Sequence, residues 1–232
     1  MLKGAADRSD VRSRRLTAAV ASGGTSGNDI YALFERLVVE FGGEGKLLDF
    51  GAGKGTLTTR LYRTGRFTRI TAVDITPRPA DLPEPIGWIS ADLNDALPFS
   101  DGGLDVIIAT EVIEHLENPR FVAREWYRLL RPGGQLLLST PNNESLRSIL
   151  ALIFRGHYAH FGQESYPAHI TALLRKDLER ILAEAGFARP SFHYTNYGMI
   201  PKTRFSWQQM SIGLLGGLRF SDNLMAVARK QC

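Results

Sequence analysis

The sequence predicts an α/β protein built on a doubly wound, mainly parallel sheet. Short apolar runs of strand character alternate with amphipathic helical patterns along most of the 232 residues, as in repeated strand–helix–strand units. The first clear run, Leu47-Leu48-Asp49-Phe50, ends in a turn with glycine at every second position, Gly51, Gly53 and Gly55. A strand, a glycine-rich turn and a helix in this order indicate a ligand site at the carboxyl edge of the sheet.

The chain is predicted to form one folded domain, residues 28–232, preceded by a flexible basic tail and linker, residues 1–27. Its length and its 44% hydrophobic composition suffice for one well-buried core and are short for two. Residues 1–20 carry five cationic and two acidic side chains, which accounts for most of the net charge of +4. Because this charge lies in a tail and not on a folded face, the composition argues against a nucleic-acid partner.

Each element follows from a local pattern. Asn28 is expected to cap a helix whose apolar positions, Ile30 to Phe41, have helical spacing. Four prolines at 77–85 exclude a long helix in the crossover after Asp74. A histidine-rich loop at 157–169 belongs to an insertion, about 142–172, that is expected to form a lid over the substrate. We predict strands at 46–50, 68–74, 86–89, 104–109, 134–140, 190–195 and 223–229, and helices at 55–64, 118–130 and 176–185, with another from Leu146.

The spacing of the glycines selects the kind of nucleotide. A dinucleotide fingerprint, G-x-G-x-x-G, would place its third glycine at position 56, where this chain has Thr56. Asp49 adds a carboxylate inside the turn, which would repel a pyrophosphate but can accept hydrogen bonds from an ammonium group. The turn therefore favours a cationic nucleoside without phosphate.

Four ordered motifs between residues 45 and 142 resemble those of the class I S-adenosylmethionine-dependent methyltransferases. They are the Asp-x-Gly-x-Gly-x-Gly turn from Asp49, an acid at the end of the next strand, Asp74, a second acid, Asp92, and the segment Leu129-Leu130-Arg131-Pro132-Gly133-Gly134-Gln135-Leu136. The resemblance implies a Rossmann-like seven-stranded sheet whose last strand is antiparallel, with S-adenosyl-L-methionine as cofactor. The cofactor-binding residues that it implies are Asp49, Gly51, Ala52, Gly53, Gly55, Asp74, Ile75, Asp92, Leu93 and Thr110.

The segment Thr110-Glu111-Val112-Ile113-Glu114-His115 follows a strand and would lie beside the cofactor. If it turns helically, Glu111, Glu114 and His115 stand at i, i+3 and i+4 and share one face. Converging carboxylates and an imidazole indicate a metal site or an acid/base cluster. The alternative is structural, since acidic side chains in a first helical turn are favourable through the helix dipole alone.

A second resemblance extends this segment. Glu-x-x-Glu-His, then Ser139-Thr140-Pro141-Asn142 and the distant His169, resemble the metal-dependent small-RNA 2′-O-methyltransferases, and Glu-x-x-Glu-His also resembles the ubiquinone-pathway O-methyltransferases. It implies a metal held by Glu111, Glu114, His115 and His169, with magnesium, manganese and zinc all open. Without a metal, His115 or His169 would be the general base, so the catalytic candidates are His115, His169 and Glu111. An RNA acceptor is disfavoured, because the folded part is nearly neutral.

These observations predict an S-adenosylmethionine-dependent methyltransferase acting on a hydroxyl of a small-molecule, glycan or lipid-linked acceptor. The apolar stretch Met199 to Leu215 fits core packing, a partner subunit or such an acceptor, so both monomer and homodimer stay open. The other classes considered are an NAD-dependent oxidoreductase and a non-catalytic cofactor-binding module. Lone histidines at 157, 160 and 193 point to no specific role. A single cysteine, Cys232, and the lack of a membrane-spanning or signal-like segment predict a cytoplasmic protein.

Overall fold

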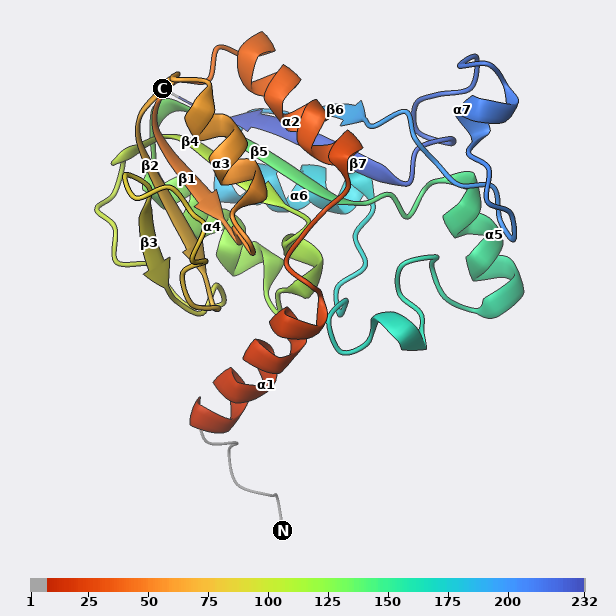
Figure 1. The fold of residues 1–232 in the computed structure, drawn as a ribbon, viewed down its shortest axis with the longest axis horizontal. Helices are drawn as coiled ribbons and strands as arrows, with labels where there is room; N and C mark the ends of the chain where they lie inside the picture. The colour runs from red at the N-terminus through yellow and green to blue at the C-terminus, as the bar shows by residue number, and fades with distance from the viewer. Residues whose placement is uncertain (1–7, 232) are drawn as a thin grey trace.

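The computed structural model describes residues 8–231 and shows one seven-stranded sheet covered by helices on both faces (Figure 1). The strand order is β3-β2-β1-β4-β5-β7-β6. The strands are β1 (Gly45–Phe50), β2 (Phe67–Asp74), β3 (Gly87–Ser90), β4 (Leu104–Thr110), β5 (Leu130–Pro141), β6 (Ser191–Tyr194) and β7 (Asn223–Arg229). Lys3 of the predicted tail and Cys232 lie outside the described residues.

Strands β1 to β5 pair in parallel, and β7 runs antiparallel to both β5 and β6. The predicted fold class is therefore confirmed, including the antiparallel last strand. Residues 75–86, between β2 and β3, contain turns and no helix, as their prolines predict. None of the described helices is both long and apolar enough to cross a membrane.

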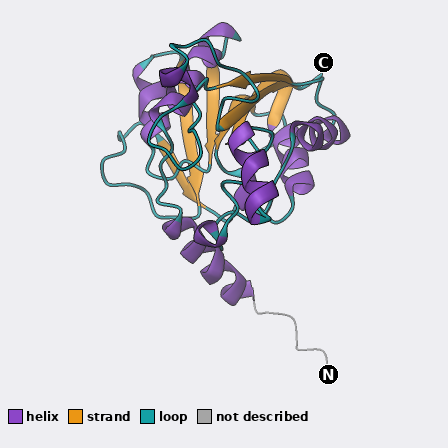
Figure 2. Cartoon of the chain, turned by 90° about the vertical axis from the view of Figure 1, so that its right-hand side faces the viewer, coloured by secondary structure: helices purple, strands orange, loops and turns teal. Residues whose placement is uncertain are grey.

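The helices form two layers around the sheet, with three further helices outside them. Helices α2 (Asn28–Glu40) and α3 (Thr56–Arg63) cover one face, and α4 (Pro119–Leu129) and α6 (Arg175–Ala185) cover the other. Helix α1 (Arg8–Ala21) projects from the carboxyl edge of the sheet, while α5 (Leu146–Arg155) and α7 (Trp207–Met210) lie at the far end from β3 (Figure 1). Figure 2 turns that end toward the viewer. Two 3₁₀ turns, η1 (Ile113–His115) and η2 (Gln163–Ser165), lie in the connections.

The continuous apolar strands follow from burial on both faces of the sheet. In β1, Leu47 packs with α2 and α3, whereas Leu48 packs with α4 and α6. In β4, Ile108 packs on the face of α2 and α3, and Ile107 packs on the face of α4 and α6. Successive strand side chains point to opposite faces, so a central parallel strand has no polar side.

The predicted boundaries differ from the structure at three informative places. Asn28 is the first helical residue and not the cap of α2, because Gly27 occupies the cap position without a side-chain bond. Strand β5 begins at Leu130, four residues before its predicted start, since Leu130 already pairs with Leu104. Helix α1 forms within the segment predicted to be a flexible tail, and its Arg15 contacts Asp92 and Glu117, which sequence periodicity does not report.

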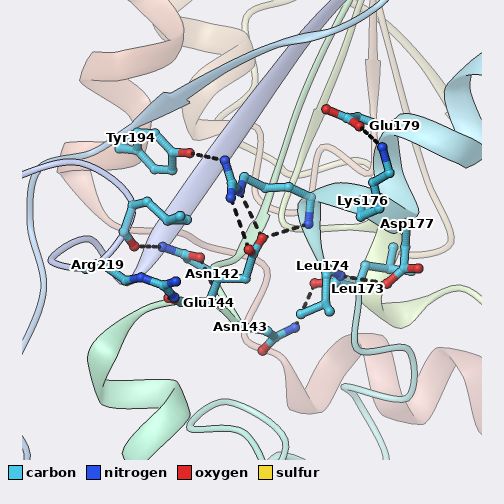
Figure 3. A network of polar contacts seen from close by, with 12 residues as sticks. Asn142, Asn143, Glu144, Leu173, Leu174, Lys176, Asp177, Glu179, Tyr194 and Arg219 are labelled. Atoms are coloured by element: carbon cyan, nitrogen blue, oxygen red, sulfur yellow. Dashed lines mark hydrogen bonds and ion pairs between the residues drawn. The ribbon is translucent and has the colours of Figure 1, made fainter.

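The base of the insertion at 142–172 is tied to the core by a polar network (Figure 3). The buried side chain of Asn143 donates from Nδ2 to the carbonyl oxygen of Leu173 over 3.0 Å. The guanidinium of Arg175 pairs with the Glu144 carboxylate, 2.9 Å from Nε to Oε2, and its backbone N–H donates to the same oxygen. Arg219 donates to the Glu144 carbonyl oxygen over 2.7 Å. The two ends of the insertion are therefore closed on each other.

Candidate active site

The glycine turn after β1 lets its backbone pass unusually close to neighbouring chain segments. Gly51 and Gly53 have φ of 83° and 54°, in the left-handed region that favours glycine. A Cβ on Gly51 would lie 2.3 Å from a Val112 methyl group, and one on Gly53 would lie 2.4 Å from the carbonyl oxygen of Gly24. Gly55 differs from these two glycines, because it is the N-cap residue of α3 and packs against Leu82.

A cavity of about 910 Å³ lies over this turn at the carboxyl edge of the sheet. Nine of the ten predicted cofactor-binding residues line it, and Gly55 does not. The nine are Asp49, Gly51, Ala52, Gly53, Asp74, Ile75, Asp92, Leu93 and Thr110. The volume falls within the range of small-molecule sites.

Three acidic side chains lie along the cavity with different partners. Asp74 ends β2 and accepts from the Gly53 N–H at 2.8 Å and from the hydroxyl of Thr76 at 2.7 Å. Burial tends to raise the pKa of Asp92, but hydrogen bonds from Arg15 and Asn94 hold that pKa below its usual value. Burial raises the pKa of Asp49 to about 7, against the hydrogen bond from the Thr58 hydroxyl.

The N-terminal segment forms the outer wall of the cavity. Arg15 of α1 reaches Asp92 with Nη1 at 2.7 Å and grips the Glu117 carboxylate with Nε at 3.0 Å and Nη2 at 2.7 Å. The Gly24 carbonyl accepts from the Lys54 N–H at 2.9 Å, so the linker crosses directly over the glycine turn. Sequence reasoning missed these contacts, because nothing local marks Arg15 as different from the four other cations of the tail.

The Glu-x-x-Glu-His segment does not form the helical turn on which its predicted common face depends. Glu111 has φ of 51° and its backbone N–H donates to Ser139 Oγ at 3.0 Å, while the 3₁₀ turn η1 begins only at Ile113. Both carboxylate oxygens of Glu111 are engaged, one by the Ser139 hydroxyl and one by Asn223 Nδ2, each at 2.7 Å. Burial raises the pKa of Glu111 to about 7, and these two hydrogen bonds oppose the rise.

Glu114, His115 and His169 come together although His169 is distant in sequence. One ligand atom from each of the three lies within 4.8 Å of the others, and Glu111 is not in this group. The loop is held in place because the N–H groups of Ile170 and Thr171 donate to the Glu114 carbonyl oxygen at 3.0 and 2.9 Å.

Each of the two histidines holds one ring nitrogen against a backbone carbonyl oxygen. Nδ1 of His115 lies 2.7 Å from the Ala168 carbonyl oxygen, and Nδ1 of His169 lies 2.7 Å from that of His160. A carbonyl can only accept, so Nδ1 carries the proton and Nε2 keeps its lone pair. Burial lowers the pKa of both imidazoles, which favours this neutral form. Oxygen Oε1 of the fully buried Glu114 has no partner among the described residues.

The histidine group and the cofactor candidates share the same cavity. His115, His169 and Glu111 line it, together with the loop residues His160 and Tyr166. His160 was not singled out from the sequence, yet its Nε2 is buried without a partner in the described structure, and burial lowers its pKa to about 4. A lone histidine in a polar loop carries no sequence signal for such a position. His157 and His193 do not line the cavity.

The fold and site define a protein of the class I methyltransferase type. The family model described as "Methyltransferase domain" matches residues 27–189, and the chain belongs to this family. Among curated relatives, a ubiquinone biosynthesis O-methyltransferase of Xanthomonas oryzae pv. oryzae is 29% identical over 146 residues, 56% of this chain and 60% of the relative. The mitochondrial enzyme of that name from Schizosaccharomyces pombe is 30% identical over 121 residues, 48% of this chain and 43% of its own. The chain thus covers less than two thirds of the length of each of these relatives.

Solved structures show the same fold at low identity. A SAM-dependent methyltransferase from Archaeoglobus fulgidus has a TM-score of 0.61 at 20% identity, covering 87% of this chain and 93% of its own. A 1,6-didemethyltoxoflavin-N1-methyltransferase from Burkholderia thailandensis, solved with S-adenosylhomocysteine, has a TM-score of 0.63 at 16% identity, with 100% and 94% covered. These likenesses support the fold and leave the acceptor to be argued from the site.

Proposed function

We propose that this chain transfers the methyl group of S-adenosylmethionine to a hydroxyl oxygen of an acceptor bound beneath the loop at 156–172. The observation that carries the proposal is the one cavity that is lined both by the glycine turn and Asp74 and by His115 and His169. A cofactor at one end and an acceptor hydroxyl at the other would share this cavity without intervening chain. Alignment of the two reactants is the main demand of such a transfer.

The cofactor end fits a cationic nucleoside. The carboxylate of Asp74, at the end of β2, would accept from a ribose diol, and that of Asp49 would accept from the ammonium group; both line the cavity. The Gly51 and Gly53 backbone admits the ligand without a side chain in the way. The same geometry disfavours NAD, since two acids flank the turn that would have to hold a pyrophosphate.

The acceptor end offers a base. The sulfonium of the cofactor makes its methyl group electrophilic, and the acceptor oxygen becomes a better nucleophile as it loses its proton. In the absence of a metal, the neutral imidazole of His115 can accept the hydroxyl proton at Nε2, because Nδ1 already carries the ring proton. His169, whose ring centroid lies 4.8 Å from that of His115, would orient the same hydroxyl.

We further propose that Glu114, His115 and His169 hold a divalent cation. Their donors fit, because one ligand atom of each residue lies within 4.8 Å of the others, and Oε1 of the buried Glu114 has no partner among the described residues. Each histidine donates its other N–H to a backbone carbonyl, the arrangement usual for metal-bound imidazoles. A bound cation would lower the pKa of the acceptor hydroxyl. Glu111 would line the site beside the cation, held in position by the hydrogen bonds that it accepts from Ser139 and Asn223.

The acceptor is proposed to be a hydroxylated small molecule, glycan or lipid-linked compound. The curated relatives' names refer to O-methylation in ubiquinone biosynthesis. The insertion at 142–172 brings His160, Tyr166 and His169 to the cavity, which supports a role as a lid over the acceptor. Residues 28–232 would form the catalytic domain.

The function is tested by ligand binding and by transfer. S-adenosylmethionine and S-adenosylhomocysteine should raise the melting temperature in a concentration-dependent way, while NAD should not. Protein incubated with methyl-labelled cofactor and a panel of phenols, catechols and sugars should label a hydroxyl-bearing member. A shift with NAD alone would overturn the proposal.

The metal is tested by direct titration. Zn²⁺ or Mn²⁺ should bind one site by calorimetry, and Glu114→Gln or His169→Ala should abolish that binding while S-adenosylhomocysteine affinity stays unchanged. Glu117→Gln, an acid outside the group, is the matched control. If the unaltered protein binds neither ion, the metal proposal fails and His115 alone is left as the base.

A further inference from the structure

We infer that α5 and the segment around α7 form a docking surface for an anionic lipid bilayer. The surface consists of the exposed apolar side chains of α5, namely Leu152, Ile153 and Phe154, and those of residues 205–214, namely Phe205, Met210, Ile212 and Leu214. It is separate from the cavity and independent of the proposed methyl transfer.

The first observation is that an apolar helix stays outside the core. Helix α5 reads Leu146-Arg-Ser-Ile-Leu-Ala-Leu-Ile-Phe-Arg155, yet Ser148 is its one buried residue. Phe154 is 80% exposed, and Ile212 and Leu214 are 92% and 88% exposed. Scattered apolar residues are normal on a protein surface, but several large apolar side chains exposed at one end of the folded molecule are typical of an interaction site.

The second observation is that the two segments belong to one end of the molecule. The Arg219 carbonyl, on the chain returning from α7, accepts from the Leu146 N–H at the start of α5 over 2.8 Å. Asn142 Nδ2 donates to the Leu218 carbonyl oxygen over 2.7 Å. Figure 1 shows α5 and α7 on the side opposite β3, and Figure 2 shows that side face on. The two segments therefore lie together at the end of the molecule opposite β3.

The third observation is the charge around the apolar side chains. Residues 145–163 and 191–221 contain no aspartate or glutamate and carry five cations, Arg147, Arg155, Lys202, Arg204 and Arg219. Among the described residues, Arg155, Lys202 and Arg204 form no ion pair, and all three are exposed. Exposed apolar side chains with unpaired cations next to them in the sequence fit the interface of an anionic bilayer, where apolar burial and electrostatic attraction add.

This surface would also bring the site toward the bilayer. The loop that follows α5 contains exposed Tyr166 and Ile170 and lines the cavity with His160 and His169. An acceptor carried in the membrane would therefore approach the mouth of the cavity that the loop forms. The docking itself needs no cofactor, so it is measured without one, and its failure would leave the proposed transfer standing.

The test is sedimentation of the full chain with vesicles of phosphatidylcholine alone or of equal parts phosphatidylcholine and phosphatidylglycerol. The protein should bind the anionic vesicles, and high salt should weaken the binding. Phe154→Ser with Ile212→Ser should reduce the partition coefficient by about tenfold or more. Arg155→Gln and Lys202→Gln should each reduce it about fivefold.

Matched controls lie on another part of the surface. Val39→Ser removes a 57%-exposed side chain of α2, and Arg63→Gln removes an exposed cation of α3, so neither should change binding. Equal binding to both vesicle types, or none to the anionic ones, would overturn the inference. So would a concentration-dependent dimer that Phe154→Ser with Ile212→Ser dissociates, since the surface would then belong to a second copy. Circular dichroism of each variant excludes misfolding as the cause of a loss.

Discussion

Asp74 shows how a single carboxylate can depend on the turn that faces it. Its oxygens are already oriented by the Gly53 N–H and by Thr76, so the side chain meets a ligand without losing further rotamer freedom. Preorganised acceptors of this kind bind hydroxyl groups more tightly than mobile ones do.

Replacing this carboxylate should therefore weaken cofactor binding directly. Asp74→Ala should cost about 1.5 to 3 kcal/mol in the binding of S-adenosylhomocysteine, the cost of hydrogen bonds to a charged group. Asp92→Ala should cost less, because the adenine amino group is neutral. Asp95→Ala, an exposed acid of the same connection, is the control. Isothermal calorimetry that shows unchanged affinity for Asp74→Ala would remove this residue from the site.

Asp49 links the cofactor site to pH. Burial raises its pKa to about 7 in the ligand-free protein, far above its usual value of 3.8. A raised carboxyl pKa means that the fold favours the protonated form, so this contribution to stability is complete below pH 3.8 and is lost as pH rises through 7. A cationic ligand favours the ionised form and reverses that preference.

Asp49→Asn should change the pH dependence of two quantities, the free energy of unfolding and the affinity for S-adenosylmethionine. The free energy of unfolding of the ligand-free variant should fall less between pH 4 and pH 7 than that of the unaltered protein. The affinity for S-adenosylmethionine should rise from pH 6 to pH 8 in the unaltered protein and stay flat in Asp49→Asn. Urea denaturation and calorimetry at each pH measure the two. Parallel curves for both proteins would show that Asp49 does not titrate in this range.

At the scale of elements, α1 is joined to the body of the protein through the side chain of Arg15. Arg15 joins α1 to Asp92 and Glu117, and the linker that follows crosses the glycine turn at Gly24. The C-terminal part of the helix covers the end of the cavity near Asp92, while the rest of the helix extends away from the body (Figure 1). Its position therefore depends on few contacts.

Loss of Arg15 should free the helix. Arg15→Ala should accelerate amide hydrogen exchange throughout α1 and raise the Kd for S-adenosylhomocysteine several-fold, less than Asp74→Ala does, because Arg15 is partly exposed to solvent and ion pairs near the surface contribute about 0 to 1 kcal/mol. Arg14→Ala is the matched control, since Arg14 is 71% exposed and its one ion pair among residues 8–231 is with Asp10 of the same helix. Exchange rates that are equal in the two variants would show that the helix is held by other contacts.

The position of the insertion at 142–172 depends instead on the hydrogen bonds that join its two ends. Asn143 is 2% exposed and spans from the end of β5 to Leu173, which precedes α6 (Figure 3). Asn143→Ala leaves a buried carbonyl unpaired and should lower the free energy of unfolding by about 1 to 3 kcal/mol. Lys176→Ala breaks only an exposed pair with Glu179 and should change it by less than about 1 kcal/mol. Guanidinium denaturation checks both, and equal losses would contradict the anchoring role of Asn143.

At the scale of the whole molecule, the sheet places the ends of three neighbouring strands at one edge. Asp49 lies on β1, Asp74 ends β2 and Thr110 ends β4, and these strands are adjacent in the sheet. Parallel pairing puts all three carboxyl ends together, which is why motifs far apart in the chain meet in one cavity. The remaining contributors, α1 and the loop at 156–172, approach this edge from outside the sheet.

The sequence by itself determined the order of strands and helices and the position of the glycine turn and Asp74 at the carboxyl edge of the sheet. Alternating apolar patterns are local, and the glycine turn and Asp74 are positioned by the strands to which they are attached, so their positions could be predicted. The boundary errors at Asn28 and Leu130 are small because they concern only where a pattern begins. The resemblance, and not the residues alone, supplied the antiparallel direction of the last strand.

Only the tertiary structure decided which side chains complete the site. Glu111 leaves the predicted common face because its backbone takes a left-handed conformation and its oxygens bond Ser139 and Asn223. His169 reaches His115 because backbone hydrogen bonds fasten its loop to Glu114, and Arg15 reaches Asp92 across the cavity. These contacts join residues dozens of positions apart. Periodicity and spacing report only which neighbours in sequence share a face, and so they carry no record of such contacts.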